Sequence, residues 1–207
     1  MRATVRFMTV MAWVFALGTT LAQAEQTKLA RPAVDPTKEA AMKAVQQAGS
    51  PSEGHKALEP LIGTWNYTMS FWMSPDAAPQ SITGTTTNTL ILGGRFLKQE
   101  VRGQAEGQPP FEGMGYTGYD NLRKEYQSVW FDNMATGIMV STGQFDPTTM
   151  TMTEQGDFSC PMTGQAHQQF RTVWKITDPT HSTYESYTHT PDGHEFKSME
   201  IHYTRAQ

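Results

Sequence analysis

Aromatic, hydroxyl and charged residues recur at every second position in several segments, where a closely packed core would carry leucine and valine. In residues 125–133, one side of the alternation consists of Tyr126, Ser128, Trp130 and Asp132. Alternate residues of a β-strand point to the same face of the sheet. Aromatic rings with a few placed polar groups are the usual lining of a small-ligand site. The pattern therefore predicts a binding cavity if these segments enclose one.

We expect this cavity to be lined by aromatic residues from several segments and to have one polar end. The candidate lining residues are Tyr67, Phe71, Trp130, Trp174 and Tyr187, with Asp132, Arg95, Arg171 and Glu185 as the polar candidates. A β-bulge shifts the facing of every residue beyond it. The charged residues could therefore equally form ion pairs or face water, and this alternative stays open.

Histidines gather near the end of the chain, where they suggest a second kind of chemistry. Two of them, His189 and His194, flank the turn at 190–193, and His181 lies on the preceding segment. Imidazoles facing each other across a hairpin can bind one metal ion. Histidines at a hairpin tip are more often exposed to solvent, so the three are weak metal candidates.

No motif for a known reaction is evident. The chain has no Gly-x-Ser-x-Gly elbow and no His-Glu-x-x-His. The glycines of 113–118 have the spacing of a dinucleotide-binding fingerprint. They lie inside a strand-like segment with no helix after it, so the phosphate-binding geometry is not expected. Four carboxylates could supply an acid/base pair: Glu100, Asp132, Glu185 and Glu200. An isomerase or hydrolase remains the alternative to a binding protein, and we assign no catalytic residue and no cofactor.

The elements that must position these residues are long strands. Period-two alternation begins at Trp65 and recurs in segments separated by turn residues such as Gly93-Gly94, Asp146-Pro147 and Asp178-Pro179. The expected strands are 65–73, 81–92, 95–103, 111–119, 125–133, 137–145, 148–156, 167–177, 182–190 and 195–205. Short connections favour antiparallel neighbours, and closure removes exposed edges. We predict an all-β fold, an antiparallel up-and-down β-barrel of about ten strands.

Short helices are expected before the barrel. Helix signals cover 38–47, with Gly49 as a stop, and 52–61, with Ser52 as the N-cap. The predicted organisation is a signal peptide at 1–24, a flexible leader and short helix at 25–50, and the barrel domain at 51–207.

The two ends of the barrel segment carry a recognisable pair. Gly63-Thr64-Trp65 opens the first strand, and Arg205 ends the last. In a closed barrel these strands are neighbours, so a guanidinium can stack on the indole. The pair resembles the signature of the lipocalin-like superfamily and implies a structural role for Gly63, Trp65 and Arg205 in closing the barrel.

A closer resemblance is carried by several separated motifs. These are Leu92-Gly93-Gly94-Arg95-Phe96-Leu97, Phe111-Glu112-Gly113, Gly118-Tyr119-Asp120-Asn121, Trp130 and Met199-Glu200-Ile201-x-Tyr203-x-Arg205. In this order the chain resembles the bacterial family of domain of unknown function 1579, from about Gly54 to Arg205. The resemblance implies a lipocalin-like, or calycin-like, barrel and no established activity. Nitrobindin-like relatives hold haem through one histidine, but the glycine-rich continuation that they show after the tryptophan is replaced here by Asn66 and Tyr67.

The N-terminus indicates export. Arg2 and Arg6 precede an apolar run at 7–17, and Ala22-Gln23-Ala24 fits a signal-peptide cleavage site. The run is shorter than the roughly 20 residues that span a bilayer, so we expect no stable membrane insertion. Removal of 1–24 takes away two arginines and no acid, which changes the formal net charge from −4 to −6. This acidic balance argues against nucleic acid as a partner.

The sequence thus predicts an exported protein, periplasmic or secreted, that binds a small and partly apolar ligand inside its barrel. The alternatives are an enzyme in the same cavity and a non-catalytic structural or interaction module. Cys160 is the only cysteine, so no intramolecular disulfide can form. The identity of the ligand, the role of Cys160 and the oligomeric state do not follow from the sequence.

Overall fold

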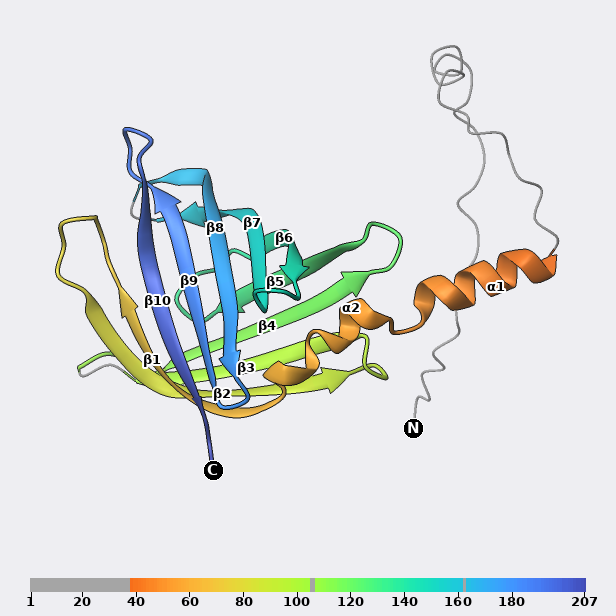
Figure 1. Ribbon diagram of the computed structural model, residues 1–207. Coiled ribbons are helices and arrows are strands. Elements are labelled where there is room, and N and C mark those ends of the chain that lie inside the picture. Colours follow the sequence, from red (N-terminus) through yellow and green to blue (C-terminus); the bar gives the residue numbers. More distant parts are fainter. Residues whose placement is uncertain (1–37, 105–106, 162) are drawn as a thin grey trace, which may run out of the picture. The chain divides into compact units, whose positions relative to one another are not determined.

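The computed structural model describes residues 38–104, 107–161 and 163–207 (Figure 1). The predicted signal peptide and the leader up to residue 37 lie outside the described residues. Helix α1 (Lys38–Gly49) coincides with the expected first helix, and none of its residues is buried. Within the described part of the chain, no helix is long and apolar enough to cross a membrane.

The second expected helix is interrupted. It consists of α2 (Glu53–Lys56) followed by the 3₁₀ turn η2 (Glu59–Leu61). Pro60 explains the break, because proline has no backbone N–H to donate to the carbonyl oxygen of Lys56. The segment turns Leu58 and Leu61 inward, and both are buried.

Ten strands form one closed antiparallel barrel, which confirms the predicted fold class. The strands are β1 (Gly63–Phe71), β2 (Gln80–Ile91), β3 (Phe96–Gln104), β4 (Phe111–Asp120), β5 (Glu125–Asp132), β6 (Met139–Asp146), β7 (Thr151–Cys160), β8 (Gln165–Asp178), β9 (His181–His189) and β10 (Glu195–Arg205). Each strand pairs with its neighbours in the chain, and β1 pairs with β10, which lies beside it in Figure 1.

The largest boundary differences concern β7, which begins at Thr151 rather than at residue 148 and ends at Cys160 rather than at residue 156. The Asp146 carboxylate accepts hydrogen bonds from the Thr148 N–H and the Thr149 hydroxyl, so the turn continues past Pro147. Met150 has a φ of 53° and belongs to the same turn. An aspartate that binds the backbone two residues on favours a turn over a strand.

The closing pair brings Trp65 opposite Arg205. The Arg205 guanidinium carbon lies 4.2 Å from the centroid of the Trp65 ring. Its nitrogens donate to the carbonyl oxygens of Ile62 at 2.6 Å, Pro60 at 2.9 Å and Pro179 at 2.8 Å. Arg205 thereby ties the last strand to the segment that enters the first and to the β8–β9 turn.

Gly63 makes this arrangement possible. Its φ of 119° lies where residues with a side chain are strained, and a Cβ atom there would collide with the Arg205 guanidinium. The residue has to be glycine for two independent reasons.

Two packed layers fill part of the barrel. One end, called the capped end below, is covered by Leu58 and Leu61, which pack on Leu97, Tyr126 and Met152. The next layer towards the middle contains Trp65, Tyr67, Val101 and Tyr203. The opposite end, called the far end, carries the β1–β2, β3–β4, β5–β6, β7–β8 and β9–β10 loops.

Replacement of Arg205 by alanine should lower the free energy of unfolding by about 2–4 kcal/mol, because three charge-assisted hydrogen bonds and one cation–π contact are lost. Urea unfolding followed by tryptophan fluorescence measures this. Arg123→Ala is the control, since Arg123 makes only exposed ion pairs, which are worth up to about 1 kcal/mol. Equal stability of the Arg205→Ala and Arg123→Ala variants would contradict the role of Arg205 in barrel closure.

Candidate ligand site in the barrel interior

Glu154 on β7 points into the barrel. It lies two residues from Met152, which is buried in the core layer at the capped end. Its direct partners on the neighbouring strands are Gly143 of β6 and Thr172 of β8, and Thr172 is buried. Strand alternation places these residues on one face, so the carboxyl group faces the interior.

Hydroxyl groups hold the Glu154 carboxyl in place. The Ser128 hydroxyl donates to Glu154 Oε1 at 2.7 Å and accepts from the Thr117 hydroxyl at 2.8 Å. Ser141 also hydrogen-bonds to the carboxyl. Desolvation raises the pKa of Glu154, and the bonds from Ser128 and Ser141 oppose that shift. The interior thus contains one carboxyl that is costly to ionise.

Several inward-facing side chains in the middle of the barrel keep part of their surface accessible. Glu154 and its neighbour Ser128 are half-buried rather than buried, although both face inward from central positions of their strands. The same holds for Trp130, Tyr184, Met199 and Ile201. In a closed barrel, the accessible surface of such side chains lies on the inside. Ten strands enclose more volume than small side chains can fill, which agrees with this observation.

Aromatic rings make up much of the wall near the capped end. The Trp174 ring stacks on Tyr203 and meets Tyr184 edge to face, each at 5.9 Å between centroids. Tyr67 lies 6.1 Å from Tyr203. Burial raises the pKa of Tyr184, which hydrogen-bonds to Thr172, and also that of Tyr203. These tyrosines are therefore neutral hydrogen-bonding groups at ordinary pH.

Trp130 and Asp132 line the interior towards the far end. The Trp130 indole N–H donates to Asp132 Oδ2 at 2.9 Å, and the Met134 N–H donates to Oδ1 at 2.9 Å. The Trp130 ring lies against Gly113, where a Cβ atom would collide with it. The glycine of the apparent dinucleotide fingerprint thus makes room for a tryptophan inside the barrel.

The structure brings five of the sequence-predicted lining residues to the inner face. These are Tyr67, Phe71, Trp130, Asp132 and Trp174. Phe71 is half-buried and pairs with Met199 of β10, whereas Tyr67 and Trp174 belong to the aromatic wall.

Three predicted residues face outward instead, because they alternate with inward residues of β8 and β9. The Arg171 guanidinium stacks on the Tyr187 ring at 4.1 Å and forms a bidentate ion pair with Glu195. Glu185 accepts from Lys197 at 3.2 Å. The charges of this outer face satisfy one another, so these three do not belong to the interior site.

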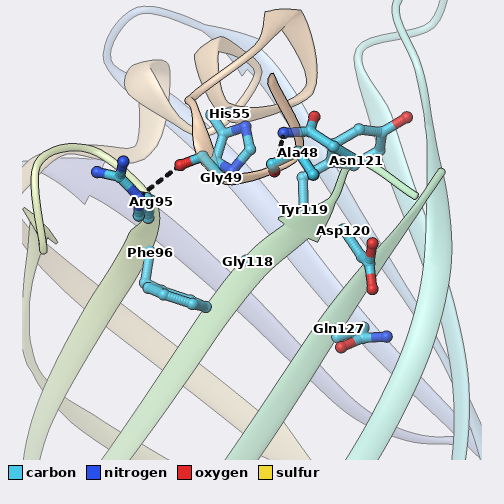
Figure 2. Close-up of a pocket in the computed structure, with 10 residues that line it drawn as sticks. All are labelled: Ala48, Gly49, His55, Arg95, Phe96, Gly118, Tyr119, Asp120, Asn121 and Gln127. Atoms are coloured by element: carbon cyan, nitrogen blue, oxygen red, sulfur yellow. Dashed lines mark hydrogen bonds between the residues drawn. The ribbon is translucent and has the colours of Figure 1, made fainter. Parts of the chain in front are cut away.

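Arg95 also lies outside the barrel, at the start of β3. Its guanidinium donates to the Gly49 carbonyl at 2.7 Å, shown as a dashed line in Figure 2, and to the Leu92 carbonyl at 2.9 Å. It borders an outer pocket of about 260 Å³ that includes His55 and Asn121. Asn121 donates to the Ala48 and Ser50 carbonyls. The polar groups of this pocket therefore anchor residues 48–50.

His55 in the same pocket has a structural role. Its Nδ1 accepts the Ser52 N–H at 3.0 Å, and its ring packs edge to face on Tyr119. Burial, with a smaller contribution from the Arg95 charge, lowers the pKa of His55, so the imidazole is neutral at ordinary pH. This interaction caps α2 at its N-terminus.

The candidate metal ligands do not converge. His181 pairs with Asp178 and His194 with Asp192, and both histidines are exposed, as is His189. Among the described residues, no group of three or more His, Cys, Asp or Glu side chains is arranged to hold a metal ion.

The predicted acid/base pair is not assembled either. Glu100 pairs with Lys98, and Glu200 pairs with Lys197 and His202, on the outer face. Of the four carboxylates proposed from the sequence, only Asp132 faces inward.

Sequence reasoning missed the polar centre of the interior. Its members are Glu154, Ser128, Ser141, Thr172 and Tyr184. One signal was present: Glu154 shares its alternation with Met152, so a buried methionine implied an inward glutamate. The misplaced start of β7 at residue 148 concealed which positions were central.

These features define a ten-stranded antiparallel barrel protein with a desolvated carboxyl on its inner face. The chain belongs to the family described as protein of unknown function (DUF1579), whose sequence profile matches residues 50–205. No curated protein shows significant similarity to the chain.

One solved structure supports the fold. The crystal structure of Rv2717c from M. tuberculosis is similar, with a TM-score of 0.58 and 15% identity over 76% of this chain and 100% of that one. Two redesigned β-barrels, b11L5F_LGL and mFAP0 bound to DFHBI, match with a TM-score of 0.37 each. Their identities are 16% and 17%, over 73% and 70% of this chain and 96% and 99% of theirs. At 15% identity the likeness to Rv2717c concerns the fold alone.

The Glu154→Gln variant should become more stable relative to the natural protein as pH rises. Because the folded-state pKa of Glu154 is raised above its ordinary value of 4.5, its ionisation destabilises the folded form. This cost is absent below the unfolded pKa and grows as pH passes through the folded pKa. Urea unfolding at about pH 4, 6 and 8 measures the difference.

Glu112→Gln is the matched control, since Glu112 is exposed on β4 and its replacement removes one negative charge from the surface. A stability difference for Glu154→Gln that is the same at all three pH values would show that Glu154 is not desolvated.

Proposed function

We propose that this protein binds a small, partly apolar ligand inside its barrel. The observation that carries the proposal is the half-buried state of inward-facing side chains around Glu154. A barrel with a purely structural role would gain stability from a filled apolar core, and a desolvated carboxyl there costs free energy. Aromatic walls together with one buried polar centre are typical of small-molecule sites.

The interior offers a ligand two kinds of contact. The aromatic wall of Trp174, Tyr184 and Tyr203 provides apolar surface. The cluster of Glu154 with its serine hydroxyls provides hydrogen bonds at one place. A ligand with an apolar body and one polar group satisfies both.

A substitution that fills the interior tests the proposal. Ser186 is half-buried and pairs with Met199 and Thr172, both on the inner face. Ser186→Phe places a ring in the remaining space and should lower the affinity for Nile red, an uncharged apolar probe, by at least about tenfold. Fluorescence titration measures the affinity.

Thr183→Phe is the matched control, because Thr183 lies on the same strand with the opposite facing. It should bind Nile red like the unmodified protein. Failure of the unmodified protein to bind the probe, or equal binding by both variants, would contradict an internal site.

We also propose that the mature protein is exported after cleavage behind Ala24. The support is the basic, apolar and small-residue order of residues 1–24. In cells that express the whole chain, mass spectrometry of the purified protein should give an N-terminus at Glu25. Replacement of Ala22 and Ala24 by leucine should block the cleavage. A protein that retains Met1 without these substitutions would contradict the proposal.

A further inference from the structure

The charges inside the barrel are unequal in sign. Among the described residues, strand alternation brings three charged side chains to the inner face: Asp132, Glu154 and Arg205. The Arg205 guanidinium donates hydrogen bonds to the carbonyl oxygens of Ile62, Pro60 and Pro179. Its flat face stacks on the Trp65 ring. The charge that remains to meet a ligand is therefore acidic.

The loops of the far end have a similar bias, with one basic side chain packed on them: the Lys197 Nζ atom lies 5.8 Å from the centroid of the Trp72 ring. In the described residues of the five loops there is no lysine or arginine, and the acidic side chains are Asp76 and Asp192, with His194 beside Asp192. The described residues of these five loops are 72–79, 107–110, 133–138, 161, 163–164 and 190–194. The turns of the capped end instead carry Arg95, Arg123 and Lys124. Charge of one sign around a low-dielectric mouth raises the local concentration of the opposite charge.

The aromatic wall suits a cation as well. The negative face of an indole or phenol ring attracts an ammonium group, and the attraction grows as water is excluded. The Trp174 ring contacts the rings of both Tyr184 and Tyr203, and Glu154 is near enough to Tyr184 for the two to interact electrostatically. A carboxyl beside such rings is a combination that recognises organic ammonium groups.

We propose that the ligand of the barrel is an organic cation, a primary ammonium group on an apolar body, bound with its charge at Glu154. The inference rests on the proposed function and specifies its ligand class. The Glu154 oxygens accept hydrogen bonds from the ammonium, and its positive charge keeps the carboxyl ionised. The apolar body lies along the aromatic wall.

An anionic ligand such as a fatty acid is disfavoured at the same place. Its carboxylate would lie beside Glu154 and, towards the far end, Asp132. No described cation faces it except Arg205, whose donors are occupied at the capped end. Like charges repel more strongly in a low-dielectric interior than in water.

Three probes of one chain length test this inference: decylamine, decanol and decanoate, titrated by calorimetry near neutral pH. Decylamine should bind at least about tenfold more tightly than decanoate, which corresponds to about 1.4 kcal/mol. Glu154→Gln should weaken decylamine binding by about tenfold and leave decanol binding within about twofold. Glu112→Gln, which removes a surface charge, should change neither.

The outcomes separate the two proposals. Binding of decanoate as tight as that of decylamine would overturn the cation inference and leave an internal apolar site in place. Unchanged decylamine affinity in Glu154→Gln would overturn the placement of the charge. Absence of binding for all three probes would overturn the proposed function itself.

Discussion

Closure of the sheet between β1 and β10 is the constraint on which the rest of the structure depends. The stacked pair of Trp65 and Arg205 holds the two ends of the barrel together and joins them to the helical segment that covers one end. A closed sheet has no free edge, so its strands can be long without pairing with another chain. Closure also creates an interior. Along each strand, every second side chain then lines this interior, and the side chains between them lie on the outer surface.

The inside is built in zones. Near the capped end, leucines and aromatic rings pack closely, and this packing contributes stability. Further along, serine and threonine hydroxyls surround Glu154, and small residues such as Gly113 leave room for large rings. The closely packed layers and the polar centre thus lie at different heights of the same barrel. A polar group in the middle lowers stability less when its hydrogen bonds are satisfied.

The outer face shows why charge alone is a poor guide to a site. Arg171, Glu185 and Tyr187 form a network with Glu195 and Lys197, in which each charge has a partner and access to water. Such surface pairs contribute little to stability or recognition. Glu154 is different because its carboxyl is desolvated and its partners are neutral hydroxyls. A buried charge without a counter-charge is where a ligand of opposite sign gains most.

The sequence by itself determined the barrel, its ten strands and the chemical types on each strand, because period-two alternation and turn residues are local properties of the chain. The sequence also predicted that Trp65 and Arg205 lie next to each other, since the first and last strands of a closed meander are adjacent. Which face is inner was decided only by the tertiary structure. The bulge beside Lys197 sets the facing of the residues on either side of it, and it depends on non-local pairing. For the same reason Glu154, unremarkable in the sequence, becomes the polar centre of the interior only when β5, β6 and β8 surround it.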